Sequence, residues 1–142
     1  MVSKLKGLGL VAFIVLCGYQ TAAEAHTLVG SIPAAKNAVI RYRITCFVPA
    51  AQMIFRVKQA KTAKFSVNLN VTSNGSSLDA TAIPIKNIWT PYGSVQGGSG
   101  DYILELSKVG VNANQAISFT VEDHCDTETG EHTAQSNAVR IR

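Results

Sequence analysis

Short runs of alternating apolar and polar residues constrain the fold of this chain more than any other feature. Successive side chains of a β-strand point to opposite faces, so a period of two predicts strands with one buried face. In the clearest run, apolar Phe65, Val67, Leu69 and Val71 alternate with polar Ser66, Asn68, Asn70 and Thr72. Similar runs, without a helical period, occupy residues 39–48, 52–58, 102–106, 116–123 and 138–141.

Turn-forming residues separate these runs. Asn74 and Gly75 predict a turn after the clearest strand, because both residue types tolerate positive φ. Pro84 interrupts the apolar stretch 80–89, so we expect an edge strand or an extended connection there. Residues 93–100 are rich in glycine but lack the lysine and the following helix of a phosphate-binding loop, which predicts a flexible connection.

Residues 1–25 have the parts of a secretory signal peptide. Lys4 and Lys6 supply its positive start, residues 8–16 its apolar core, and Ala23-Glu24-Ala25 a small-x-small cleavage site. The core is shorter than the roughly 20 residues that span a membrane. Cys17 would be the lipidated first residue of a lipoprotein. However, the lipoprotein signal peptidase needs a small residue before this cysteine, and Leu16 stands there. We therefore predict a signal peptide (1–25) and one periplasmic or secreted domain (26–142) without a membrane anchor.

The two cysteines of the expected mature chain, Cys46 and Cys125, both fall on the apolar side of their strands. Cys46 shares its side with Ile40 and Ile44, and Cys125 shares its side with Ile117, Phe119 and Val121. Because exported proteins form disulfides, we expect a Cys46–Cys125 bridge that adds about 4 kcal/mol of stability. The sequence therefore predicts an all-β fold, an Ig-like antiparallel β-sandwich of about seven strands with one inter-sheet disulfide.

Charge and motifs exclude several classes of function. The net charge of +4 falls to +3 without the signal peptide, and the basic residues are scattered, so we expect no nucleic-acid partner. No Gly-x-Ser-x-Gly motif is present, and Glu105 and Glu122 are typical surface residues rather than a glycosidase pair. Catalysis is therefore not indicated. Asn70 and Asn74 begin glycosylation sequons, which matter only in a eukaryotic source.

The histidines are the residues that point to chemistry. Cleavage after Ala25 would make His26 the first residue, and its amine and imidazole can then chelate a metal ion, copper best of all. His124 and His132 are the other two histidines, and they lie in a segment (122–132) that holds five of the eight acidic residues beyond residue 25. We expect one of them to complete the site, with a weaker oxygen ligand from Glu131 or Asp126.

The start of the expected mature chain resembles the periplasmic copper-binding proteins of the CopC type. Residues 26–34, His-Thr-Leu-Val-Gly-Ser-Ile-Pro-Ala, are similar to the processed start of those proteins. The resemblance implies a β-sandwich that binds copper through His26 and a second histidine before the final strand, matched by His132. The chain departs from the family where Gly130 replaces an aspartate, and the expected disulfide is not a family feature.

Two functional hypotheses follow. In the first, an exported sandwich binds copper through its N-terminal histidine for storage, delivery or resistance. In the second, a cofactor-free extracellular interaction or structural module contacts a protein partner through the loops 93–100 and 126–132. Calcium is a weaker alternative to copper, because Asp126, Glu128 and Gly130 have the spacing of the start of a calcium loop but lack its remaining ligands.

Overall fold

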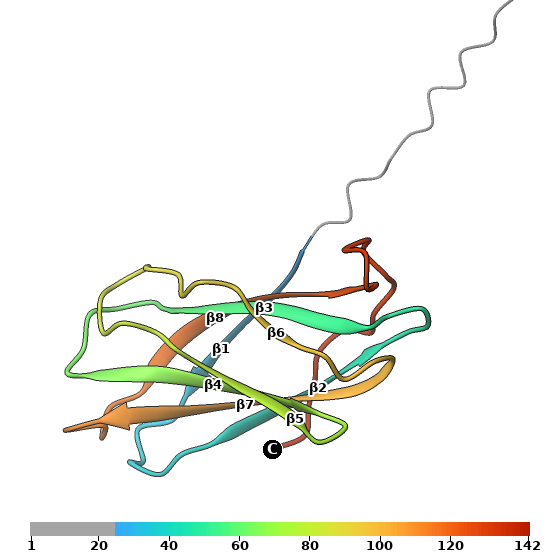
Figure 1. Ribbon diagram of the computed structural model, residues 1–142. Coiled ribbons are helices and arrows are strands. Elements are labelled where there is room, and N and C mark those ends of the chain that lie inside the picture. Colours follow the sequence, from blue (N-terminus) through green and yellow to red (C-terminus); the bar gives the residue numbers. More distant parts are fainter. Residues whose placement is uncertain (1–24) are drawn as a thin grey trace, which may run out of the picture.

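The structure, a computed structural model, describes residues 25–142. The expected signal peptide, apart from Ala25, and Cys17 lie outside the described residues. Two antiparallel sheets pack face to face (Figure 1). The first sheet has, in spatial order, β1 (His26–Ile32), β8 (Ile117–Asp126), β3 (Gln52–Gln59) and β6 (Gly93–Val95). The second has β5 (Ser76–Thr81), β4 (Phe65–Ser73), β7 (Gly100–Gly110), β2 (Ile40–Cys46) and β9 (Val139–Arg140).

The predicted all-β sandwich is confirmed, but the described residues form nine strands rather than about seven. The sequence runs match β2, β3, β4, β7, β8 and β9 within a few residues. β1 and β6 carry few buried side chains, so alternation did not reveal them. In addition, β1 pairs with β8, whereas the final strand β9 pairs with β2 in the other sheet.

The predicted disulfide joins the two sheets. Cys46 on β2 and Cys125 on β8 are bonded, with their Cα atoms 5.7 Å apart. Both side chains belong to the core, which consists mainly of inward-facing residues of β2, β3, β4, β7 and β8 and includes large side chains such as Tyr102, Phe55 and Phe119. The disulfide therefore fixes β8 to the opposite sheet at the end of the strand that carries the candidate ligands.

The glycine-rich segment 93–100 is only in part the connection that the sequence predicted, because strands include both of its ends. Gly93 begins β6, and Gly100 begins β7. A Cβ atom at Gly93 would lie 2.9 Å from a methyl carbon of Leu78 and 3.0 Å from the Phe55 ring. The Gly97 amide donates a hydrogen bond to Tyr102 Oη at 3.1 Å. Glycine is needed here because the backbone packs closely against its neighbours.

The apolar stretch 80–89, expected as an edge strand or an extended connection, begins with the last two residues of β5 and is otherwise an extended connection. β5 ends at Thr81 as an edge strand, and an extended connection follows up to β6. Backbone hydrogen bonds from Asn87 to Gln59 and from Thr90 to Val57 hold this connection along β3. It carries the aromatic side chains that lie over the outer face of the first sheet. Within the described part of the chain, no helix could cross a membrane.

Candidate metal centre

Two candidate ligands lie on the outer face of β8. His124 is the register partner of Ile54 on β3, and Asp126 is the partner of Gln52. Residues two positions apart on a strand share a face, so these two side chains point the same way. Their neighbour Cys125 points into the core. The alternation that buries the disulfide therefore also turns His124 and Asp126 away from the core.

A turn after β8 brings the third ligand to the same place. The Thr127 amide donates to the Glu131 carbonyl at 2.8 Å, and Gly130 adopts a φ of +83° that favours glycine. The chain then returns along β8, where His132 forms an isolated antiparallel bridge with Asp126. The Thr133 amide donates to the Cys125 carbonyl at 2.8 Å. His132 consequently lies beside Asp126 and His124.

The three side chains have the spacing of ligands around a single ion. One ligand atom from each of His124, Asp126 and His132 lies within 4.8 Å of the others. His124 Nε2 is 3.4 Å from Asp126 Oδ2, and His132 Nδ1 is 3.7 Å from Asp126 Oδ1. Both distances exceed those of ordinary hydrogen bonds. Two ligands about 2.0 Å from a tetrahedral ion are about 3.3 Å apart, so this spacing suits a shared metal.

The three candidate ligands differ in burial, and burial affects the protonation of His124. The side chain of Asp126 is 8% exposed and that of His124 is 16% exposed, whereas His132 is 35% exposed. Burial lowers the pKa of His124 from its usual value near 6.5, an effect that the Asp126 charge opposes and the His132 charge reinforces. His124 is therefore neutral at neutral pH, the form that binds metal. Asp126 Oδ1 and His124 Nδ1 are buried without a hydrogen-bond partner.

Aromatic and charged side chains surround the cluster on the same face. The Tyr92 ring meets His124 edge-on, with centroids 6.4 Å apart. Tyr92 Oη donates to Glu122 Oε1 at 2.6 Å, and Arg56 pairs with the other oxygen of that carboxylate at 2.8 Å. These bonds, led by that from Tyr92, lower the pKa of Glu122. Tyr92 thus covers one side of the His124 imidazole and is itself fixed by Glu122.

The structure brings together three of the five sequence-predicted ligands. His26 is the register partner of Asp123 on β8, so its side chain lies on the face of the sheet opposite to His124. Glu131 is exposed, and its backbone rather than its carboxylate closes the turn. His124 and His132, which the sequence offered as alternatives, belong to one cluster with Asp126.

Sequence reasoning missed Asp123. This carboxyl group is 1% exposed and belongs to the inward-facing row of β8, alongside Val121 and Cys125. Burial raises its pKa from 3.8 to about 6, although a hydrogen bond from Gln135 lowers it. The phase that places Cys125 in the core applies equally to residue 123. This alternation along β8 could have indicated, from the sequence alone, that the Asp123 side chain is buried.

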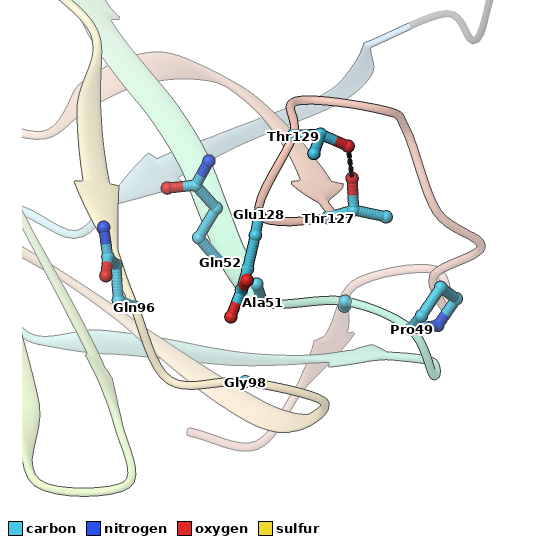
Figure 2. A pocket seen from close by; sticks show the side chains of 9 residues that line it. Pro49, Ala51, Gln52, Gln96, Gly98, Thr127, Glu128 and Thr129 are labelled. Atoms are coloured by element: carbon cyan, nitrogen blue, oxygen red, sulfur yellow. Dashed lines mark hydrogen bonds between the residues drawn. The ribbon is translucent and has the colours of Figure 1, made fainter.

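A surface hollow of about 730 Å³ lies beside the turn that follows Asp126, and its lining includes Ala51, Gln52, Thr127, Glu128 and Thr129 but none of the three candidate ligands. In Figure 2, the turn that follows Asp126 forms one side of it, and the hydroxyl groups of Thr127 and Thr129 are hydrogen-bonded to each other at 3.1 Å. Of its polar lining residues, Gln96, Glu128 and Thr129 are exposed, whereas Gln52 and Thr127 are half-buried. Open space therefore reaches the turn that positions His132.

Comparisons with protein-family models and with curated protein sequences find no match to this chain. The resemblance of residues 26–34 to CopC-type proteins stays a prediction from the sequence.

Proposed function

We propose that this domain binds one divalent transition-metal ion, with a preference for Cu(II), through His124, Asp126 and His132. The single observation that carries the proposal is the approach of two imidazoles and one carboxylate within 4.8 Å on one face of β8. Three protein ligands leave coordination positions for water or a transferred ligand. The proposed role is therefore to hold or deliver the ion.

The donor set supports copper over calcium. Calcium takes six to eight oxygen ligands, whereas this cluster offers two ring nitrogens and a single carboxylate. Imidazole suits copper, zinc and nickel, and copper binds most tightly among the divalent ions of the first transition row. The Cys46–Cys125 disulfide fits an oxidising compartment outside the cytoplasm, where copper is in the Cu(II) state.

The site is built to hold its ligands before the ion arrives. β8 fixes His124 and Asp126, and the bridge between Asp126 and His132 fixes the third residue. Two buried polar atoms, His124 Nδ1 and Asp126 Oδ1, lack hydrogen-bond partners. An ion would supply a partner for the carboxylate oxygen, which burial otherwise makes costly.

Titration of the protein with Cu(II), followed by calorimetry and electron paramagnetic resonance, tests the proposal. We expect one equivalent bound, with hyperfine splitting from two nitrogen ligands. His124→Ala and His132→Ala should each lower the affinity by at least about 100-fold. The matched control is His26→Ala, which should leave the affinity unchanged.

The control also separates this site from the N-terminal copper site that the sequence suggested. Loss of copper binding in His26→Ala, with normal binding in His124→Ala, would overturn the proposal in favour of the N-terminal site. Equal binding in all three variants would show adventitious surface binding and would likewise overturn it.

A further inference from the structure

One end of the sandwich is basic and its connections contain no acidic residue. It is the end opposite to the metal centre, at the left in Figure 1. The four connections at this end, none of which contains aspartate or glutamate, are residues 33–39, 60–64, 82–88 and 111–116. Four exposed lysine side chains lie on them: Lys36, Lys61, Lys64 and Lys86. We call this surface the lysine end.

Hydrogen bonds fix two of these connections, 60–64 and 82–88, to each other. The Ala63 amide donates to the Pro84 carbonyl at 3.2 Å. The Lys86 amide donates to Thr62 Oγ1 at 3.1 Å. The lysines of these two connections therefore lie on one surface, although the connections are separated in the sequence by β4 and β5.

A buried lysine joins the other two connections. Lys108 Nζ, at the end of β7, donates to the carbonyls of Pro33 at 2.6 Å and Ala34 at 3.0 Å. It also donates to the Gln115 carbonyl at 3.0 Å. Residues 62–65 and Gln115 line the same hollow of about 570 Å³, which brings both pairs of connections together. The lysine end is consequently one surface held by hydrogen bonds rather than four separate loops.

Exposed apolar side chains lie among these lysines. Ile83, Ile85 and Ile88 are each between 44% and 50% exposed, and Val111 is 70% exposed. Isolated exposed apolar residues are ordinary on a protein surface, but apolar side chains grouped on one surface are typical of an interaction site. The lysine end therefore offers both positive charge and apolar contact area.

The charges at this end have no acidic partner. Within residues 25–142, none of its four exposed lysines lies within ion-pair distance of an acid. Acidic side chains gather instead beside the metal centre, at Asp126, Glu128 and Glu131. β8 connects the two ends over ten residues, which is about 30 Å. The domain therefore has a basic, partly apolar end and an acidic end that carries the candidate ligands.

We propose that the lysine end docks onto the surface of a bilayer that contains anionic phospholipids. Apolar side chains such as Ile83 and Ile85 would enter the boundary between headgroups and acyl chains, and the lysines beside them would meet the lipid phosphates. A soluble polyanion would use the lysines but would leave the isoleucines in water, so the apolar group favours a lipid surface. Docked in this way, the domain holds its candidate metal centre away from the bilayer and open to solution.

Vesicle co-sedimentation tests the proposal. The protein is isolated after export from an expressing cell, and mass spectrometry identifies its first residue, because an uncleaved apolar segment 8–16 would itself bind lipid. The probes are vesicles of phosphatidylglycerol and phosphatidylcholine in equal parts and vesicles of phosphatidylcholine alone. We expect at least about 100-fold tighter binding to the anionic vesicles, because each lysine near an anionic surface contributes about fivefold. Equal binding to both vesicles, or no binding to either, would overturn the proposal.

Charge and apolar variants locate the docking surface. Lys61→Gln, Lys64→Gln and Lys86→Gln should each weaken binding about fivefold, and the triple variant about 100-fold. Arg43→Gln, which removes an exposed charge from the outer face of the second sheet, is the matched control and should change the affinity by less than about twofold.

Ile85→Ser should also weaken binding at least about fivefold. Its matched control is Val139→Ser, because Val139 on β9 is 49% exposed and Ile85 is 50% exposed. In bicelles that contain a spin-labelled lipid, the methyl signals of Ile85 should broaden, whereas those of Val48 at the opposite end should not. Thermal unfolding shows that each variant is folded.

The remaining outcomes decide between a bilayer and other partners. Unchanged vesicle binding in the folded triple lysine variant and in Ile85→Ser would overturn the proposal. Binding to dextran sulfate as tight as to anionic vesicles, without any effect of Ile85→Ser, would identify a polyanion site instead. Vesicle binding should persist in His124→Ala, because His124 lies near the other end of β8. The result is therefore independent of the Cu(II) experiment.

Discussion

The imidazoles of His124 and His132 lie with their centroids 4.5 Å apart and their planes inclined by 37°. One ring comes from β8 and the other from the loop that returns after it. Two rings this close repel each other when both are protonated, because each then carries a positive charge. The Asp126 carboxylate approaches both rings, Oδ2 near His124 and Oδ1 near His132. The His132 charge therefore adds to burial in lowering the pKa of His124, against the opposing effect of Asp126.

The first prediction concerns proton competition at this pair. Because burial lowers the pKa of His124, this imidazole is already neutral at neutral pH and releases no proton when metal binds. We expect the apparent Cu(II) affinity to change little between pH 7 and pH 8. Once the pH falls below the lowered pKa of His124, the affinity should fall by about tenfold per pH unit, because a proton then competes with the metal ion for this imidazole.

Calorimetric titration in buffers of different ionisation enthalpy measures this proton release directly. The control is the same titration of His132→Ala, in which a single imidazole of the cluster remains. A steep rise of affinity between pH 7 and pH 8 in the unmodified protein would contradict the assignment of His124 as a neutral ligand.

The second prediction concerns the stability cost of Asp123. Its pKa is raised from 3.8 to about 6 in the folded protein, so the folded state binds more protons than the unfolded state between these values. Stability should therefore decrease as pH rises from about 4 to about 6, by about 3 kcal/mol in total. Asp123→Asn removes this loss, and we expect it to be more stable than the unmodified protein at neutral pH.

Urea unfolding of metal-free protein at a series of pH values measures the effect. The advantage of Asp123→Asn should shrink as the pH falls toward 4 and should vanish below about pH 3, where the carboxyl group is protonated in both states. Glu128→Gln is the control, because this acid is exposed. Parallel stability profiles of Asp123→Asn and the unmodified protein would contradict the prediction.

The alternation of apolar and polar residues and the strand face on which each cysteine lies were sufficient to predict the sandwich. Both are properties of single strands. The strand of Phe65, Val67 and Leu69 is confirmed as β4, and the phase of Cys46 and Cys125 correctly predicted the inter-sheet disulfide. β6 was missed because it has only three residues and its one glycine, Gly93, packs through the backbone, which leaves no pattern of side chains. Pairing partners are also set by tertiary packing, so the sequence did not reveal that β1 lies beside β8.

The candidate site was predictable in part. The sequence singled out His124, Asp126 and His132, but it offered the two histidines as alternatives. Their proximity depends on the bridge between Asp126 and His132, which the turn with Gly130 produces. The position of His26 on the opposite face depends on its register with Asp123. Neither a turn geometry nor an inter-strand register can be derived from residue types alone.

The third prediction concerns the disulfide. The bridge spans a sequence separation of 79 residues, and the chain-entropy model gives about 4 kcal/mol for closing such a loop. We expect the double variant Cys46→Ala and Cys125→Ala to lose at least this amount, because two buried sulfur atoms are also removed from the core. Guanidinium unfolding measures the loss, with Val29→Ala as an exposed control. A loss below about 1 kcal/mol would show that the bridge contributes little to the stability of the sandwich.

The fourth prediction concerns Gln135, which connects the His132 segment to β8. Its amide bonds both Asp123 and the Cys125 backbone, so Gln135→Ala leaves two buried groups unpaired and should cost about 2–4 kcal/mol. The segment should then move relative to His124, and the Cu(II) affinity should fall by about 10–100-fold although no ligand is changed. Gln96→Ala, at an exposed position, is the matched control for both measurements. The paramagnetic resonance spectrum of bound copper reports the geometry of its ligands. A changed spectrum in folded Gln135→Ala would therefore indicate lost positioning rather than lost stability. An unchanged spectrum and affinity would show that the Asp126–His132 bridge suffices to hold the site.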